Sequence, residues 1–310
     1  RQVSKPMFEL WVPITIAAAF LQNARSAIQK HLKGRLSTTG ATFVRFGFGM
    51  PVAIVYVLIL HFGLELPIPQ MTVEFWLYVV VGGLSQILAT FLLVYLFGLR
   101  NFAVGTAYSK TEPVQAAVFG LVILGDPLSV GAGVAIAIGL AGVVLISVAH
   151  TKLSTKSLAD AMFSRTAAIG LLSGAMFGLS AVGYRAASLS IGGGEQEFLM
   201  QAGFALLCAT VFQTVVMTAY MQWREPGQIM AVLRAWRPAS LVGLAGVLGS
   251  VGWSTAMTIQ SVAYVRSLAQ IELIFTFAVS YFFFKERPNR PEIIGVILIA
   301  VGIIVLLHAK

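Results

Sequence analysis

Ten stretches of about twenty apolar residues follow one another along this chain, and they restrict the folds it can adopt. Soluble domains carry about 25% charged residues, whereas this chain is 58% hydrophobic and 11% charged, with a mean hydropathy of +0.87. One globular core could not bury so much apolar surface, so the sequence predicts an all-α integral membrane protein. We place the spans at 10–29, 41–62, 75–98, 102–124, 129–149, 166–189, 197–221, 238–259, 262–284 and 292–308.

The second half of the chain repeats the first. A shift of 160 residues superposes the halves without a gap, and the informative matches are charged: Arg25 with Arg185, Glu112 with Glu272, and Asp126 with Glu286. Five spans per half is an odd number, so the second half must cross the membrane in the opposite sense. We expect two inverted-topology five-helix repeats, at 1–149 and 166–310, joined by a loop at 150–165.

Charges in the connectors predict the orientation. The connectors after odd-numbered spans hold thirteen lysines and arginines, whereas those after even-numbered spans hold none and carry acidic residues instead. By the positive-inside rule, the odd-numbered connectors are cytoplasmic and both termini lie outside a cytoplasmic (inner) cell membrane. The sequence pI near 9.9 therefore reflects topology, and we expect no nucleic-acid partner.

Seven charged residues lie in the interior of the predicted spans, away from the residues at the span ends. A charge at the bilayer centre costs at least ~2.5–3.5 kcal/mol, so these side chains should face a wet cavity or one another. Glu112 and Glu272 lie about ten residues into spans four and nine, and a rise of ~1.5 Å per residue places both near the midplane. Arg45 lies near a basic connector, where its side chain is expected to snorkel to the interface. The set is Arg25, Arg45, Lys110, Glu112, Arg185, Arg266 and Glu272.

Three roles are open for the two glutamates. In the first, they bind the substrate or a coupling proton, because burial favours the neutral form of a carboxyl group. In the second, Arg25 with Glu112 and Arg185 with Glu272 form ion pairs that gate opposite faces in turn. In the third, the glutamates belong to permanent structural pairs.

Span four carries further polar groups near Glu112. Tyr108 and Gln115 share its helix face, at spacings of i−4 and i+3, whereas Lys110 points nearly the opposite way and is not expected to pair with Glu112. Pro113 removes a backbone donor and is expected to kink this span beside Glu112.

Candidates on the other spans complete the expected site. Lys110 and Arg266 are equally suited to binding a substrate anion and to forming a structural pair. The remaining polar or aromatic candidates for the cavity are Gln22, Asn23, Gln86, Tyr95, Tyr184, Gln213, Trp253, Tyr264 and Gln270.

Small residues recur at helical spacing and predict close helix packing. Packing within the chain and a dimer interface are both compatible with these stripes, so the protein is expected to be a monomer or a homodimer. The stripes are Gly170, Gly174 and Gly178 on span six, Gly131, Ala135 and Gly139 on span five, and Gly243, Gly246, Gly249 and Gly252 on span eight.

The ends of the two halves carry a family likeness. Residues 112–147 and 272–307 each contain a fourth helix, a short acidic turn (Gly125-Asp126 and Lys285-Glu286) and a glycine-containing fifth helix. In this the chain resembles the drug/metabolite transporter superfamily and, within it, the EamA-type carriers, although Asp126 departs from the glutamate more usual at that turn. The resemblance implies that the first four helices of each half line a central cavity, while the fifth helices, 129–149 and 292–308, pack at the side.

These observations predict a secondary active transporter in the lipid bilayer. Its substrate is expected to be a small polar or zwitterionic metabolite, such as an amino acid, which it exports by alternating access coupled to protons or to exchange. We expect no cofactor and no metal, because the chain has no nucleotide-binding loop and a single cysteine, Cys208. A passive channel and a membrane-embedded enzyme are the alternatives, and the second lacks an H-E-x-x-H or G-x-S-x-G motif.

Overall fold

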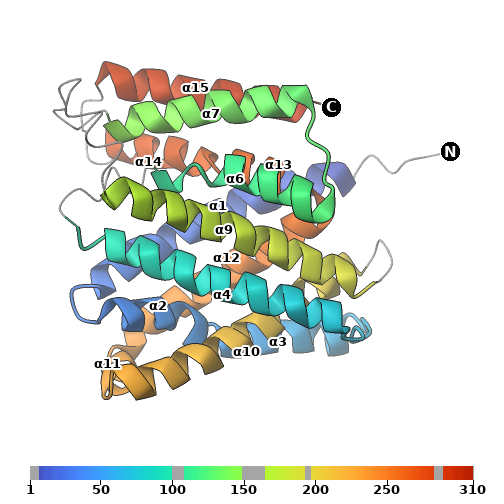
Figure 1. Cartoon of the computed structure of the whole chain (residues 1–310), viewed down its shortest axis with the longest axis vertical. Coiled ribbons are helices and arrows are strands. Elements are labelled where there is room, and N and C mark those ends of the chain that lie inside the picture. Colours follow the sequence, from blue (N-terminus) through green and yellow to red (C-terminus); the bar gives the residue numbers. More distant parts are fainter. Residues whose placement is uncertain (1–6, 100–107, 149–164, 193–196, 283–288, 310) are drawn as a thin grey trace.

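The protein is a bundle of helices that lie side by side (Figure 1). The computed structural model describes residues 7–99, 108–148, 165–192, 197–282 and 289–309, and within these ranges all regular structure is helical. In this described part of the chain, six helical segments are long and apolar enough to cross a membrane, and two shorter apolar helices, Glu112–Leu124 and Val130–Ile146, accompany them. The chain is therefore a multi-pass membrane protein.

The first half begins with a long helix and then breaks its second predicted span in two. The break falls at Phe48 and Gly49, and Pro51 follows in the first turn of the next helix, where its missing N–H is tolerated. Ser37 caps the N-terminus of the earlier piece by accepting a hydrogen bond from the backbone N–H of Gly40 at 3.0 Å. The helices are α1 (Met7–Leu32), α2 (Thr38–Gly47), α3 (Met50–Leu58), α4 (Val73–Leu96), α6 (Glu112–Phe119) and α7 (Val130–Val148), with π-helical turns at Ile59–Gly63 and Gly120–Leu124.

The second half contains one helix that the sequence did not predict. This is α11, which begins after Gly227, a glycine with a φ of 91° that other residues rarely adopt. At the other end of the half, Asn289 and Glu292 form a capping box that fixes the start of the last helix. The helices are α9 (Arg165–Ser190), α10 (Phe198–Arg224), α11 (Gln228–Arg234), α12 (Trp236–Ile259), α13 (Val262–Leu268), α14 (Ile271–Phe282) and α15 (Arg290–His308).

Spans four and nine, predicted as continuous helices, are both interrupted. In the described part of span four, the chain turns at Lys110 and helix α6 begins at Glu112. The sequence suggested that Pro113 kinks a continuous helix. Instead, Pro113 occupies the first turn of α6, where a proline fits. In span nine, α13 ends at Leu268 and α14 begins at Ile271. Each of the two glutamates thus lies in the first turn of a short helix.

The long helices pack across the two halves of the chain. Helix α1 packs against α12, where a Cβ on Gly252 would lie 2.9 Å from the Cβ of Ala18. Helix α4 packs against α9, where a Cβ on Gly183 would lie 2.9 Å from the Cα of Gly82. The shift of 160 residues exchanges α1 with α9 and α4 with α12, so these two interfaces correspond to each other.

Helices α7 and α15 form a separate pair at one edge of the bundle (Figure 1), where the resemblance places the fifth helices. A Cβ on Gly142 would lie 2.6 Å from the carbonyl oxygen of Gly295, and one on Gly302 would lie 3.0 Å from that of Ala135. The shift of 160 residues converts one contact into the other, so the pair has an approximate two-fold relation. Here the small residues of span five pack within the chain.

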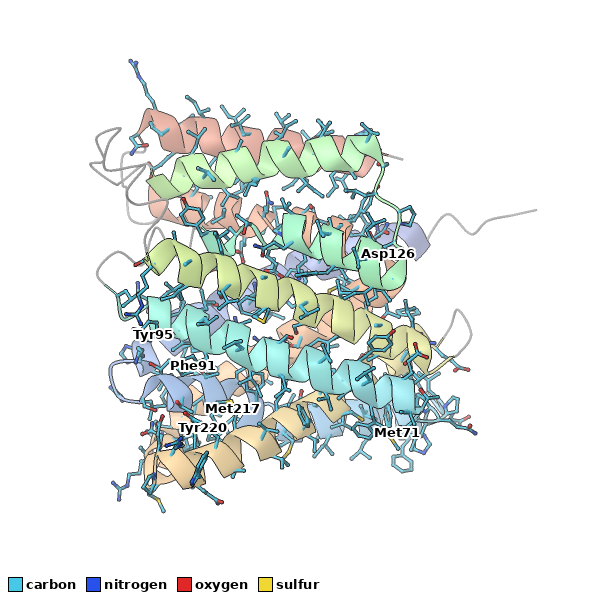
Figure 2. The ribbon with its side chains drawn as sticks, viewed as in Figure 1. Met71, Phe91, Tyr95, Asp126, Met217 and Tyr220 are labelled. Atoms are coloured by element: carbon cyan, nitrogen blue, oxygen red, sulfur yellow. The ribbon has the colours of Figure 1, made fainter. Side chains whose placement is uncertain are left out.

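The two ends of the bundle can be named by residues that lie there. Helices α1 and α4 finish at the Lys30 end, close to Tyr95 in Figure 2. Helices α9 and α12 finish at the opposite, Asp126 end, where α1 begins and α15 finishes (Figures 1 and 2).

Candidate substrate cavity

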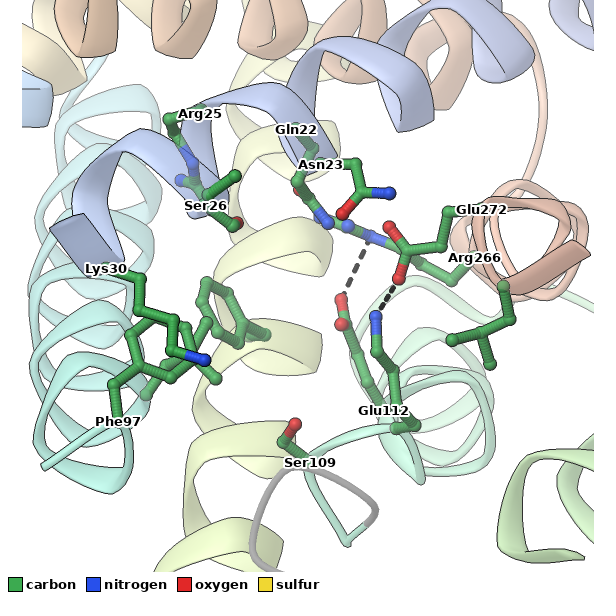
Figure 3. Close-up of a pocket in the computed structure, with 15 residues that line it drawn as sticks. Gln22, Asn23, Arg25, Ser26, Lys30, Phe97, Ser109, Glu112, Arg266 and Glu272 are labelled. Carbon is green, nitrogen blue, oxygen red and sulfur yellow. Dashed lines mark hydrogen bonds and ion pairs between the residues drawn. The ribbon is translucent and has the colours of Figure 1, made fainter. Parts of the chain in front are cut away.

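A cavity of about 400 Å³ lies between the two halves of the chain (Figure 3). This volume is within the range of small-molecule sites, about 300–1,000 Å³. It extends from the paired charges at the starts of α6 and α14 to the Lys30 end, where Lys30 and Phe97 form part of its wall. Seven of the residues predicted from the sequence line it: Gln22, Asn23, Arg25, Lys110, Glu112, Arg266 and Glu272.

Two ion pairs cross the cavity, and each joins one half of the chain to the other (Figure 3). Arg266 Nε lies 3.0 Å from Glu112 Oε1, although its N–H is not aligned for a hydrogen bond. Lys110 Nζ is in direct contact with Glu272 Oε1. As the sequence predicts, Lys110 does not pair with Glu112 in this arrangement, and its partner is the glutamate of the other half.

The interrupted helices explain how these charges are held inside the bundle. The N-terminal end of a helix carries a partial positive charge, which stabilises a carboxylate in its first turn. Glu112 in α6 and Glu272 in α14 both have this placement. Arg266 lies in the last turn of α13, where the partial charge is negative and favours a cation.

Trp253 lies behind this charged group. Its ring is buried, and the guanidinium carbon of Arg266 lies 4.6 Å from the ring centroid, within the range of a cation–π contact. Trp253 is absent from the residues that line the cavity. Trp253 therefore orients Arg266 from the side away from the cavity. The sequence predicted that Trp253 itself would line the cavity.

Arg25 lines the cavity but does not pair with Glu112, the partner considered from the sequence. Glu112 is occupied by Arg266, and the guanidinium of Arg25 donates instead to the hydroxyl of its neighbour Ser26 at 3.2 Å. The Arg25 side chain is only 2% exposed, and its Nε has no hydrogen-bond partner among the described residues.

Arg45 was expected to snorkel to the membrane interface, and this prediction is wrong. The residue is 6% exposed and donates to the hydroxyls of Thr90, at 3.1 Å, and Ser250, at 3.3 Å. Both this side chain and that of Arg25 pass close to Gly246 on α12, where a Cβ would lie 3.4 Å from Arg45 Cγ and 3.5 Å from Arg25 Cδ. Two arginines therefore pack against the same part of α12 inside the bundle.

Arg185 also has a different partner from the one considered. It pairs with Asp126, with Nε 3.1 Å from Oδ2 and Nη2 3.3 Å from Oδ1, and its Nη1 donates to the carbonyls of Met257 and Gln260. Glu272 is already held by Lys110, and Gly125, with a φ of 66°, turns the chain so that Asp126 faces Arg185. This cluster, which we call the Arg185 clasp, lies at the Asp126 end.

Three of the predicted site residues form a buried network away from the cavity. Tyr184 donates to Gln86 Oε1 at 2.8 Å, and Gln213 Nε2 donates to the Tyr184 hydroxyl at 2.9 Å and to Gln86 Oε1 at 3.0 Å. These residues belong to α9, α4 and α10 and satisfy one another. The arrangement matches a packing role.

The remaining candidates lie beside the cavity or farther away. Gln270 borders a small space next to the ion pairs, and Gln115 faces α9, where its Nε2 lies 3.4 Å from the Leu171 carbonyl. Tyr108 accepts, through its carbonyl, a hydrogen bond from Thr111. Tyr264 contacts the Ser129 hydroxyl at 3.2 Å, and Tyr95 does not line the cavity. Glu286 lies outside the described residues.

Sequence reasoning missed several lining residues, and one group of them had a signal. Gln22, Ser26 and Lys30 follow one another at intervals of four along α1, so they share one helix face. Recognising Gln22 as a candidate could therefore have led to the other two. Phe97 and Ser109 also line the cavity, and no pattern in the sequence indicates them.

Comparison with known proteins decides the family. The model of the EamA-like transporter family matches residues 9–148 and 164–308, which together make up most of the chain. The chain belongs to the EamA-like transporter family. This EamA-family protein also resembles a solved crystal structure with 15% sequence identity and a TM-score of 0.68, which covers 97% of this chain and 98% of the other. At that identity the likeness shows the fold alone, and no curated protein matches the chain.

Proposed function

We propose that this EamA-family transporter exports a small polar or zwitterionic metabolite, such as an amino acid, by alternating access. The machinery would be ten transmembrane helices in two inverted five-helix repeats that rock around the ion pairs. Support comes from the corresponding α1–α12 and α4–α9 interfaces, from the two-fold relation of α7 and α15, and from the charged site between the halves.

The observation that carries this proposal is the difference between the two ends of the bundle. Toward the Lys30 end there is a cavity of about 400 Å³. Toward the Asp126 end the space bordered by Asp126 and Ser261 is only about 10 Å³, and one water molecule needs at least ~10–15 Å³. Among the described residues, a site with a large cavity toward one end and tight packing toward the other fits a carrier better than a continuous channel.

Packing and charge both close the Asp126 end. Trp11, Met257 and Val262 belong to one buried apolar cluster, and the Arg185 clasp joins α9 to the turn at Asp126 and to the end of α12. By the positive-inside rule, the basic connectors favour a cytoplasmic position for the Lys30 end in an inner membrane. Substrate would therefore enter from the cytoplasm, which supports the direction of export.

The ion pairs between the halves suggest how a proton could be coupled to transport. Protonation of Glu112 would release Arg266, and protonation of Glu272 would release Lys110. Each event would loosen one of the charged contacts that join the halves at the cavity. A gradient-driven carrier or an exchanger would use this step to change the preferred conformation.

Transport in liposomes tests this function. The purified protein is reconstituted, and uptake of labelled amino acids is measured with and without internal counter-substrate and with and without a pH gradient. We expect saturable uptake that internal counter-substrate accelerates. A flux that does not saturate and ignores internal substrate would indicate the channel instead.

The coupling role is tested with Glu112→Gln and Glu272→Gln, each measured as above. Loss of the pH dependence with survival of exchange would support proton binding by the glutamate. If both variants keep full gradient-driven transport, the two carboxyl groups do not couple protons.

A further inference from the structure

The charges around the cavity do not balance. Among the described residues that line it, four side chains are basic and only two are acidic. Both acidic groups are occupied, because Glu112 pairs with Arg266 and Glu272 with Lys110. No carboxylate of the described lining is therefore left for Arg25.

Arg25 is buried without a counter-ion among the described residues. Its side chain is 2% exposed, its guanidinium donates to the neutral hydroxyl of Ser26, and its Nε has no hydrogen-bond partner in the described part of the chain. A buried charge is costly unless an opposite charge lies beside it. The structure thus contains a cationic position on the cavity wall for which the described protein supplies no anion.

A second arginine strengthens this imbalance. Arg45 packs against Gly246 next to Arg25, and its guanidinium bonds to the hydroxyls of Thr90 and Ser250, which are neutral. The aliphatic parts of both buried arginines therefore lie against Gly246, and neither arginine forms an ion pair within the described ranges. Their combined field favours a negative charge in the adjoining cavity.

We propose that the substrate is a small organic anion whose carboxylate supplies the counter-charge of Arg25. This inference rests on the proposed transport function and narrows its substrate to a molecule with net negative charge, such as an acidic amino acid or a short dicarboxylate. A guanidinium binds a carboxylate with charge-assisted hydrogen bonds. A zwitterion has no net charge, so its binding would leave the excess positive charge of the site uncompensated.

Matched pairs of probes test the proposal in reconstituted liposomes. L-glutamate is compared with L-glutamine, and succinate with succinamide, because the members of each pair have nearly the same shape and differ in charge. We expect counterflow of the anionic member to exceed that of the neutral member by about ten-fold, which corresponds to about 1.4 kcal/mol. In Arg25→Gln the preference should fall to about two-fold or less, and Arg25→Lys should recover part of it.

A matched control removes a positive charge elsewhere. Arg224 lies at the end of α10 and stacks on Trp223, outside the cavity, so Arg224→Gln should keep the preference for the anion. Saturable counterflow in which glutamine equals or exceeds glutamate would overturn the anion proposal and leave the transporter standing. Absence of saturable counterflow for every probe and for the neutral amino acids would count against the transporter itself.

Thermal unfolding in detergent gives a second measurement that needs no transport. Glutamate should raise the Tm of the unmodified protein, whereas glutamine should not, and Arg25→Gln should lose the glutamate effect. Without any ligand, Arg25→Gln should unfold at the same temperature as the unmodified protein or higher, because it removes an uncompensated charge. A marked fall in Tm would show that Arg25 is structural and would overturn the proposal.

Discussion

Arg25 and Arg185 occupy equivalent positions in the two halves, yet their surroundings are opposite. Arg185 is clasped by Asp126 and by the carbonyls of Met257 and Gln260, and the space bordered by Asp126 is only about 10 Å³. Arg25 bonds to Ser26 and lies on the wall of a large cavity. A carrier that alternates between two states should place its two equivalent side chains in different environments in either state, and this structure does so.

The same comparison indicates what the other state would look like. The carbonyl of Met257, which Arg185 contacts, corresponds to that of Phe97 after the shift of 160 residues. Phe97 lines the cavity together with Arg25 in the present structure. If the halves exchange conformations, Arg25 should approach the Phe97 carbonyl while the Arg185 clasp opens.

The largest effect is expected from locking the closed end. The hydroxyls of Ser188 on α9 and Thr258 on α12 lie 2.8 Å apart beside the clasp, so cysteines at these positions have their β-carbons within reach of a disulfide. In a Cys208→Ser background, oxidation of Ser188→Cys with Thr258→Cys should abolish transport, and a reductant should restore it. The matched pair at the open end, Ile28→Cys with Gly98→Cys, should not cross-link readily without substrate. Full transport after complete oxidation of the first pair would show that this end need not open.

A smaller loss is expected when the clasp is weakened. Arg185→Gln leaves Asp126 and two carbonyls without their cation, and for this partly exposed pair the free energy of unfolding should fall by about 2 kcal/mol. Transport should fall as well, because the closed state loses its main polar contacts. Denaturant unfolding and counterflow measure the two effects. Arg25→Gln should not lower the free energy of unfolding. If Arg185→Gln does not lower it either, the two arginines do not differ in their structural role.

The ion pairs midway between the ends should give an intermediate effect. Glu112→Gln and Arg266→Gln each leave a partner uncompensated, whereas the double variant removes both charges. We expect a coupling of about 1–2 kcal/mol in a double-mutant cycle of unfolding. Additive single effects would show that this contact does not hold the halves together.

The smallest effect is expected one residue from the clasp. Tyr184→Phe removes a hydroxyl from the network with Gln86 and Gln213, and should cost about 1 kcal/mol or less of unfolding free energy. Transport should stay within about two-fold of the unmodified protein, since a core contact of this size rarely alters a distant site. A loss comparable to that of Arg185→Gln would place Tyr184 in the transport machinery after all.

Much of this molecule could be predicted from its sequence, and the failures have physical reasons. Apolar length and the 160-residue repeat indicated a helical membrane protein, and the rarity of charges inside spans drew attention to Glu112, Glu272, Lys110 and Arg266. The break between α13 and α14 was missed because Ala269 and Gln270 carry no glycine or proline signal. Without that break, the placement of Glu272 in a first helical turn could not be seen.

The sequence indicated which charged residues matter, but it did not indicate which residues they contact. Arg185 pairs with Asp126 in this conformation, and a sequence does not state which end of a carrier is closed. Arg45 was assigned to the interface from its distance along the chain, whereas the hydroxyls of Thr90 on α4 and Ser250 on α12 hold it inside the bundle. Both outcomes depend on tertiary packing between helices that are far apart in the sequence.

The difference between the two ends is tested most directly by the reactivity of single cysteines with a maleimide. Ser26→Cys lies in the cavity beside Arg25, and Ala186→Cys is its equivalent beside Arg185, both in a Cys208→Ser background. If the conformation described here holds nine-tenths of the population, Ser26→Cys should react about ten-fold faster, and substrate should narrow the difference. Equal rates that substrate does not change would contradict a carrier that is open at the Lys30 end and closed at the Asp126 end.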